Sequence, residues 1–105
     1  MGQLIFSPQS KEDLKNIYDY IKKDSTVNAK KVRNTIIEES KKLLKFPEIG
    51  REIIKTSKNS IRQILVYRYR IFYRIFKDDI EIVSIYHSSR LIENNPGLQH
   101  FFEEE

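Results

Sequence analysis

Arginine and histidine side chains recur between residues 62 and 90, in a stretch otherwise composed of strand-forming residues. Residues 67–76 read YRYRIFYRIF, and residues 87–90 read HSSR. An arginine can hold a phosphate through paired N–H donors, and a histidine can transfer a proton near neutral pH. An arginine beside a histidine at the end of a sheet is therefore a candidate site for RNA cleavage. The residues concerned are Arg70 and His87.

Arginines are costly to bury, so we expect those of this stretch to line one exposed face of the sheet: Arg62, Arg68, Arg70 and Arg74. That face is the candidate surface for binding a target or a nucleic acid. A simpler interpretation is also open. The arginines are then solvated or paired with Glu81, and His87 is an ordinary residue at a strand end.

The geometry of the last hairpin decides whether the two candidate residues meet. If the hairpin turns through a two-residue loop at Asp78-Asp79, Lys77 faces Ile80, and the residue numbers of every further facing pair add up to the same total. Arg70 then lies opposite His87, on the same face of the sheet. A loop one residue longer would change this pairing.

Two helices should precede the sheet. Ser7-Pro8 is typical of a helix N-cap followed by proline, and a second helix follows the caps at 24–26 and ends near Phe46-Pro47. Apolar residues recur at helical spacing in both segments, so the helices should form an antiparallel hairpin whose apolar stripe faces the sheet. Short β-branched and aromatic runs predict strands at 53–54, 61–66, 69–76 and 80–86, with a possible edge strand at 4–6.

These elements predict an α+β fold, in which the helical hairpin packs on one face of a twisted antiparallel sheet of three or four strands. The 105 residues suit a single domain over 1–105, with a tail at 93–105 that ends in three glutamates. Hydrophobic residues make up 39% and charged residues 32%, which is typical of a folded domain. Without the last three glutamates the net charge rises from +4 to +7, which favours an anionic partner.

The composition also excludes several classes of function. The absence of cysteine removes disulfides, thiolate metal sites and cysteine nucleophiles, and suits a reducing cytoplasm. With two histidines and no acidic cluster beside either, we expect no metal site and no cofactor. We also expect no membrane span, and the first residues lack the pattern of a signal peptide, so a cytoplasmic location is expected.

Several motifs, taken in order, resemble the RelE/ParE superfamily of bacterial toxins. They are the helical hairpin, Phe46-Pro47 with Gly50-Arg51, the run YRIFYRI at 69–75, and His87 with Arg90. The resemblance covers residues 7–90. It implies a small α+β toxin that is neutralised by an acidic antitoxin wrapped around it, and that contacts operator DNA only through this antitoxin.

The superfamily has two branches with different targets. RelE-like members cut messenger RNA on the ribosome, and the resemblance then assigns catalysis to Arg70, Arg90 and His87. The resemblance implies that those enzymes also use a pair of lysines on the preceding strand and a tyrosine six residues after the second arginine. Both are missing here, because residues 61–65 contain only one basic residue, Arg62, and Pro96 stands six residues after Arg90. ParE-like members inhibit DNA gyrase without cutting nucleic acid, and the helical hairpin favours this branch. A third possibility is an inactive relative that only binds its antitoxin.

Overall fold

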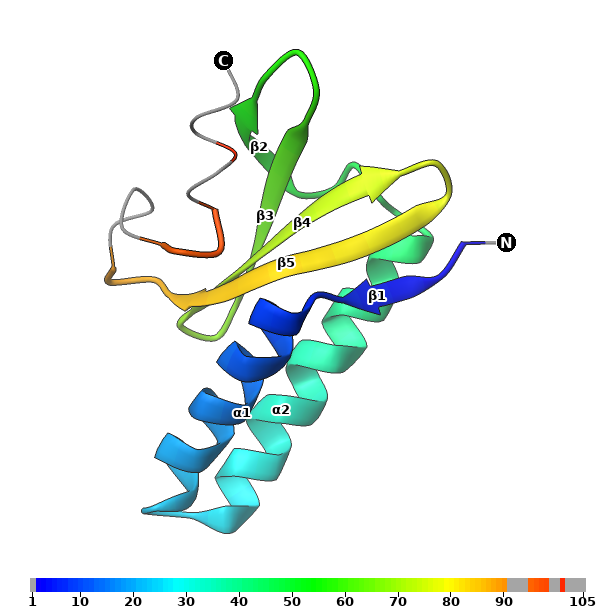
Figure 1. Cartoon of the computed structure of the whole chain (residues 1–105). Coiled ribbons are helices and arrows are strands. Elements are labelled where there is room, and N and C mark those ends of the chain that lie inside the picture. The colour runs from blue at the N-terminus through cyan, green and yellow to red at the C-terminus, as the bar shows by residue number, and fades with distance from the viewer. Residues whose placement is uncertain (1, 91–94, 99–100, 102–105) are drawn as a thin grey trace.

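The computed structural model describes residues 2–90, 95–98 and 101 and shows two helices beside one sheet (Figure 1). The elements follow in the order β1 (Leu4–Phe6), α1 (Pro8–Lys22), α2 (Thr26–Lys41), the 3-10 turn η1 (Lys42–Leu44), β2 (Arg51–Lys55), β3 (Ser60–Val66), β4 (Tyr69–Phe76) and β5 (Asp79–His87). The predicted helical hairpin is confirmed, and the meander of β2 to β5 is confirmed as antiparallel.

Local sequence signals set the ends of both helices. The Ser7 side chain accepts a hydrogen bond from the backbone N–H of Ser10 at 3.1 Å, and Pro8 occupies the first helical turn. Ser25 caps α2 in the same way. These bonds satisfy backbone donors that a helix leaves free at its N-terminus, so each helix begins where the sequence predicts.

The sheet has five strands in the order β1-β5-β4-β3-β2, one or two more than predicted. The additional strand is β1, which is the edge strand anticipated at residues 4–6, and it pairs with β5 in parallel. The sheet is therefore mixed rather than purely antiparallel. The α+β class is confirmed, with the helices stacked against one face of the sheet (Figure 1).

The predicted register of the last hairpin is wrong. Its two-residue loop is Lys77-Asp78, because Phe76 pairs with Asp79, and Lys77 has a positive φ of 57°. A bulge then shifts the pairing beyond Tyr73, where two residues of β5 oppose one of β4. Because side chains alternate between faces, this extra residue puts each later side chain of β5 on the face opposite to the one it would otherwise occupy. Arg70 consequently pairs with Tyr86, and His87 pairs with Tyr69.

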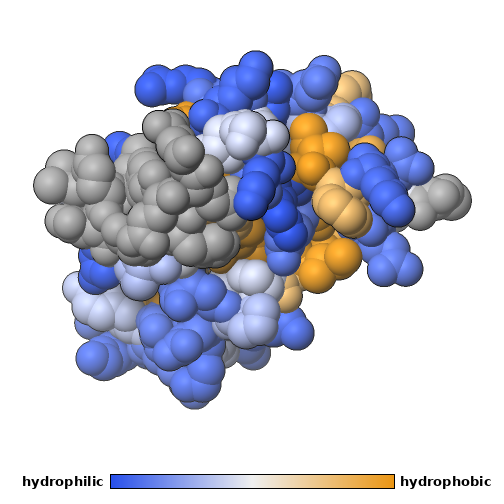
Figure 2. Space-filling model, turned by 45° about the horizontal axis from the view of Figure 1, so that its top comes forward, coloured by the Kyte–Doolittle hydropathy of each residue, from blue (hydrophilic) through white to orange (hydrophobic). Residues whose placement is uncertain are grey.

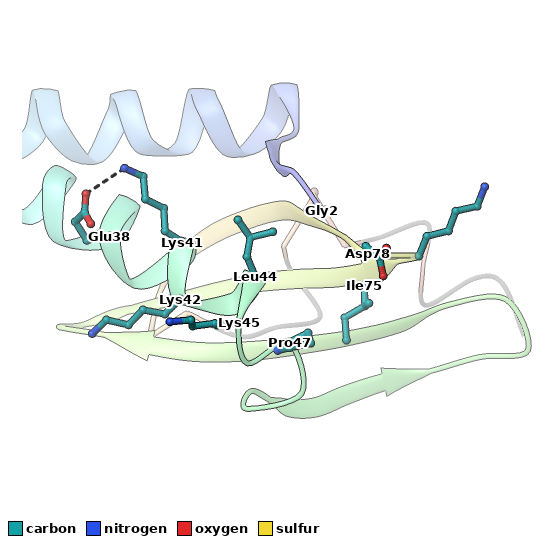
Figure 3. Close-up of a pocket in the computed structure, with 10 residues that line it drawn as sticks. Gly2, Glu38, Lys41, Lys42, Leu44, Lys45, Pro47, Ile75 and Asp78 are labelled. Carbon is teal, nitrogen blue, oxygen red and sulfur yellow. Dashed lines mark hydrogen bonds and ion pairs between the residues drawn. The ribbon is translucent and has the colours of Figure 1, made fainter.

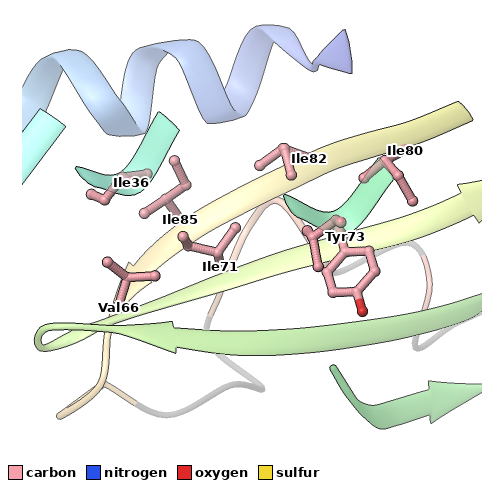
Figure 4. Packing of buried hydrophobic residues seen from close by; sticks show 8 residues of the cluster. Ile36, Val66, Ile71, Tyr73, Ile80, Ile82 and Ile85 are labelled. Atoms are coloured by element: carbon pink, nitrogen blue, oxygen red, sulfur yellow. The ribbon is translucent and has the colours of Figure 1, made fainter. Parts of the chain in front are cut away.

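Two apolar clusters hold the sheet from its two faces. The helix-side face carries Ile71, Tyr73 and Ile82, which are fully buried against residues of the helices such as Ile36 (Figure 4). The far face carries Phe72 and Val83 and is covered by residues that follow the last strand, Leu98 and Phe101.

A buried tyrosine fixes the turn between the helices and the sheet. The Tyr73 hydroxyl donates a hydrogen bond to the carbonyl of Pro47 at 2.7 Å and accepts one from the N–H of Gly50 at 2.9 Å. A Cβ at Gly50 would lie 2.5 Å from this hydroxyl, so the close approach requires glycine. Arg62 adds a bond to the carbonyl of Gly50 at 2.7 Å.

Candidate functional site

The candidate catalytic residues lie where the β3–β4 turn meets the end of β5. Two hydrogen bonds join these segments, one from the Ser88 N–H to the carbonyl of Arg68 at 2.7 Å, and one from the Arg70 guanidinium to the carbonyl of Ser88 at 3.1 Å. Tyr67 turns the chain with a positive φ of 55°. The backbone around the candidate residues is therefore held by contacts between segments about twenty residues apart in the sequence.

His87 is positioned on the helix-side face. Its ring meets that of Tyr69 edge to face, with 5.6 Å between the ring centroids, and Tyr69 packs against the helix-side cluster. The Ser89 N–H donates to His87 Nδ1 at 3.1 Å, so the proton of the neutral ring is on Nε2. The Ser89 hydroxyl also lies 2.7 Å from Nδ1. The imidazole is thus oriented by its own strand end and by an aromatic neighbour.

Arg70 and Arg90 belong to the far face instead. Arg70 pairs with Tyr86, which packs against the far-face cluster. Arg90 is exposed, and its guanidinium carbon lies 5.2 Å from the centroid of the Tyr86 ring. The two arginines therefore flank one tyrosine. The predicted neighbourhood of Arg70 and His87 is wrong, because the two side chains leave the sheet on opposite faces.

The expectation that four arginines share one exposed face is also wrong. Arg62 is opposite Tyr73 on the helix-side face and bonds to the carbonyls of Glu48 and Gly50. Arg74 is on the far face, where it forms an ion pair with Glu81 and donates to the side chain of Asn59 at 2.9 Å. The contacts of Arg62 and Arg74 are therefore structural, because both side chains bond to partners within the fold.

The remaining two arginines of the set differ from each other. Arg68 is exposed in the β3–β4 turn, and Arg70 is half-buried beside Tyr86 and the carbonyl of Ser88. Pairing with Glu81, which the simpler interpretation anticipated, is confirmed for Arg74 alone. Of the six candidate residues, Arg68 and Arg90 are therefore the most exposed to a partner.

Two partly or fully buried tyrosines, Tyr69 and Tyr73, do not supply a base at neutral pH. Burial raises the pKa of the Tyr69 phenol above its ordinary value of 10.0, with Tyr20 adding to the rise and Arg68 opposing it. Burial likewise raises the pKa of Tyr73, against a smaller opposite effect of the hydrogen bond from Gly50. Both phenols stay protonated at pH 7, so they can donate a hydrogen bond but cannot abstract a proton.

Sequence reasoning missed an apolar groove along the outer side of β3. β2 pairs with β3 only as far as Gln63, so the groove runs beside the unpaired part of β3 and is bordered by the turn after η1. Three large apolar side chains around it are mostly exposed: Phe46 at 59%, Ile49 at 69% and Leu65 at 65%. Figure 2 shows apolar side chains gathered among hydrophilic ones on one face of the molecule. The available signal was the presence of two apolar residues, Phe46 and Ile49, in the turn beyond the end of the helical pattern.

The described residues contain no cluster of three histidine, cysteine or acidic side chains that could hold a metal ion. Across the same residues, no helix combines the length and the apolar character needed to cross a bilayer.

The fold is that of a small α+β protein, with a helical hairpin packed on a mixed sheet. Residues 4–92 match the family model for the ParE toxin of the type II toxin–antitoxin system parDE, so the chain belongs to the ParE toxin family. Its fold is similar to a solved structure of the chromosomal ParDE toxin–antitoxin system from P. aeruginosa, with a TM-score of 0.68 and 22% identity, covering 83% of this chain and 96% of that chain. A search of curated proteins found no match.

Proposed function

We propose that this chain is the growth-arresting toxin of a type II toxin–antitoxin pair, acting in the cytoplasm and targeting DNA gyrase rather than messenger RNA. Membership of the ParE toxin family supports the toxin assignment. The separation of His87 from Arg70 supports the choice of target. A nuclease needs a proton-transferring group within hydrogen-bond reach of the reacting atoms that its phosphate-binding group holds. Here the imidazole is on the helix-side face and the arginine on the far face.

The antitoxin is the partner for which the surface offers the clearest match. The groove along β3 exposes Phe46, Ile49 and Leu65, and an apolar area of this kind is typical of a binding surface. Lys42 borders the groove in an ion pair with Glu39, and the body of the chain is basic. An acidic antitoxin segment with apolar anchors would satisfy both features. Operator DNA is then contacted through the antitoxin.

One observation favours messenger RNA cleavage on the ribosome as a second candidate. Arg70 and Arg90 flank Tyr86 on the far face, and two cations around an aromatic ring can hold a phosphate and stack a base. In an RNA-cleaving toxin, Arg70→Ala or Arg90→Ala should lower cleavage at least about tenfold, because each such contact contributes a few kcal/mol to the transition state. The acid–base role would rest with a group other than His87 in its present position.

The experiment that separates the two targets is induction in a bacterial host, followed by labelled thymidine and labelled amino acids over the first minutes. Gyrase inhibition should stop DNA synthesis first, whereas mRNA cleavage should stop protein synthesis first. Purified gyrase then provides the direct assay, since the chain should block supercoiling in the absence of ribosomes. If neither synthesis falls, the chain is an inactive relative and the proposed toxicity is refuted.

The matched variants are Arg70→Ala with Arg90→Ala, and, as the control, Arg51→Ala at the exposed start of β2. Under the gyrase proposal the double variant should remain folded and toxic. Loss of toxicity in the folded double variant, but not in the control, would contradict that proposal and favour RNA cleavage.

A further inference from the structure

The loop between β3 and β4 consists of two residues, Tyr67 and Arg68, because Val66 pairs with Tyr69 across the hairpin. The loop closes beyond the Val66 side chain, at the end of the sheet (Figure 4). Tyr67 occupies the first loop position with a positive φ of 55°, where glycine or asparagine is the usual residue. A Cβ crowds the neighbouring backbone in this conformation, so a tyrosine here costs stability.

The contacts of the Tyr67 side chain within the fold offset little of this cost. The residue is 51% exposed. Its hydroxyl lies 3.3 Å from the Thr35 hydroxyl of α2, in a surface contact that has little effect on stability. Strained residues concentrate at functional sites, where the side chain serves a second molecule. Tyr67 is therefore a candidate for contact with a partner.

Lys77 shows that the backbone conformation alone does not mark a binding site. It has a positive φ of 57° at the same position of the β4–β5 loop, at the opposite end of β4. The second residue of that loop, Asp78, lies next to Gly2 (Figure 3). The Lys77 ammonium lies over the ring of the preceding residue, Phe76, at 5.7 Å from its centroid. The two loops thus share a backbone conformation and differ in what they present, so Lys77 provides a matched control for Tyr67.

Arg68 adds a charge to the β3–β4 loop, and a bond to β5 holds the loop in place. The Arg68 side chain is exposed and, within the described part of the chain, forms no ion pair. Its backbone carbonyl accepts a hydrogen bond from the Ser88 N–H at 2.7 Å. Tyrosine and arginine are enriched among the residues that dominate binding energy, and a loop that is already ordered loses little entropy on binding.

We propose that the loop formed by Tyr67 and Arg68 contacts DNA gyrase, an inference that rests on the proposed function. A two-residue tip presents too few atoms for a broad interface. It should therefore insert into a recess of the target, with the Tyr67 ring against apolar side chains and the Arg68 guanidinium beside a carboxylate. The antitoxin is assigned to the groove along β3, and neither loop residue lines that groove. The two partners should accordingly depend on different residues.

The test measures how well the purified full-length chain and its variants inhibit supercoiling by gyrase, together with the melting temperature of each protein. Tyr67→Gly removes the ring and relieves the strained backbone in one step. It should weaken inhibition at least about tenfold, as expected for a residue that dominates binding, with an unchanged or higher melting temperature. Arg68→Ala should also weaken inhibition. A melting temperature that falls together with inhibition in Tyr67→Gly would assign the ring to the fold and overturn the proposal.

Matched variants separate this inference from its alternatives. Lys77→Gly makes the same backbone change in the other loop and should leave inhibition unchanged. Calorimetry should give the same antitoxin affinity for wild type and Tyr67→Gly, and loss of that affinity with intact inhibition would assign the loop to the antitoxin instead. Equal losses of inhibition in the two glycine variants would also overturn the proposal. A wild-type chain without effect on gyrase would refute the proposed function and this inference with it, whereas a fully inhibitory Tyr67→Gly would refute this inference alone.

Discussion

Replacing Tyr73 by phenylalanine should destabilise the protein far more than the loss of one oxygen atom suggests. The side chain is fully buried, and its hydroxyl is bonded both to the carbonyl of Pro47 and to the N–H of Gly50. Phenylalanine keeps the ring in the core but leaves both backbone groups without this partner. The Gly50 N–H is buried, whereas the half-buried Pro47 carbonyl remains closer to solvent.

The expected cost follows from these two bonds. A net hydrogen bond contributes about 1 kcal/mol, and a buried donor left without an acceptor costs about 1–3 kcal/mol. We therefore expect Tyr73→Phe to lower the free energy of unfolding by roughly 2–3 kcal/mol. For a domain of this size each kcal/mol shifts the melting temperature by about 4–8 °C, so the midpoint should fall by roughly 10–20 °C.

The assay is chemical and thermal unfolding of the two proteins, followed by circular dichroism. Tyr67→Phe is the matched control, because that hydroxyl is 3.3 Å from the Thr35 hydroxyl on the exposed surface and its loss should cost less than about 0.5 kcal/mol. Equal stability of wild type and Tyr73→Phe would refute the assignment of the turn to this hydroxyl. A fall of similar size in both variants would also contradict it.

The same pair of proteins gives a pH dependence of known sign. Burial raises the pKa of Tyr73 in the folded protein above the ordinary 10.0. Below pH 10 the phenol is neutral in both states, so its contribution is fully present. As the pH rises above this value the unfolded chain loses the proton first, and the contribution declines through the folded pKa. The stability difference between wild type and Tyr73→Phe should therefore narrow above pH 10, and a difference that widens would contradict the sign.

Three further substitutions test other parts of the fold and surface. Leu98→Ala removes a fully buried side chain from the far-face cluster and should cost about 2–5 kcal/mol in unfolding experiments; a neutral effect would mean that the segment is not docked in solution. Asp13→Ala removes the carboxylate that accepts from the Ile85 N–H at 2.9 Å and should cost roughly 2–3 kcal/mol by the same measurement. Leu65→Asp should weaken antitoxin binding at least about tenfold in calorimetry, since burying a leucine side chain is worth about 1.5–3 kcal/mol, whereas Val27→Asp at the exposed tip of the helical hairpin should not. Equal affinities of these two variants would exclude the groove along β3 as the antitoxin site.

The parts of the fold that could be predicted are those determined by neighbouring residues. Ser7 and Ser25 cap helices through bonds to residues three positions ahead, so the signal and the structure lie in the same short segment. Strand positions followed from β-branched and aromatic runs for the same reason. The parallel pairing of β1 was not predicted, because it joins residues more than seventy positions apart.

The register of β5 shows why the candidate site was harder to predict. Immediately after the bulge, the Asp13 carboxylate accepts hydrogen bonds from the Ser84 hydroxyl at 3.0 Å and from the Ile85 N–H at 2.9 Å. A residue of α1 therefore occupies the edge of β5 at the point where β1 has ended. No pattern within 69–90 reports this distant contact, yet the bulge beside it determines which face His87 occupies. The pairing of Arg70 with His87 failed for that reason.

The pairing of β1 with β5 also has a consequence for synthesis of the protein. β1 precedes its partner in the sheet, β5 at residues 79–87, by more than seventy residues. During translation the first strand must wait with its backbone groups open to solvent until β5 has left the ribosome. The complete sheet, and any surface that depends on it, can therefore form only after β5 has been made. A chain released early would lack this surface.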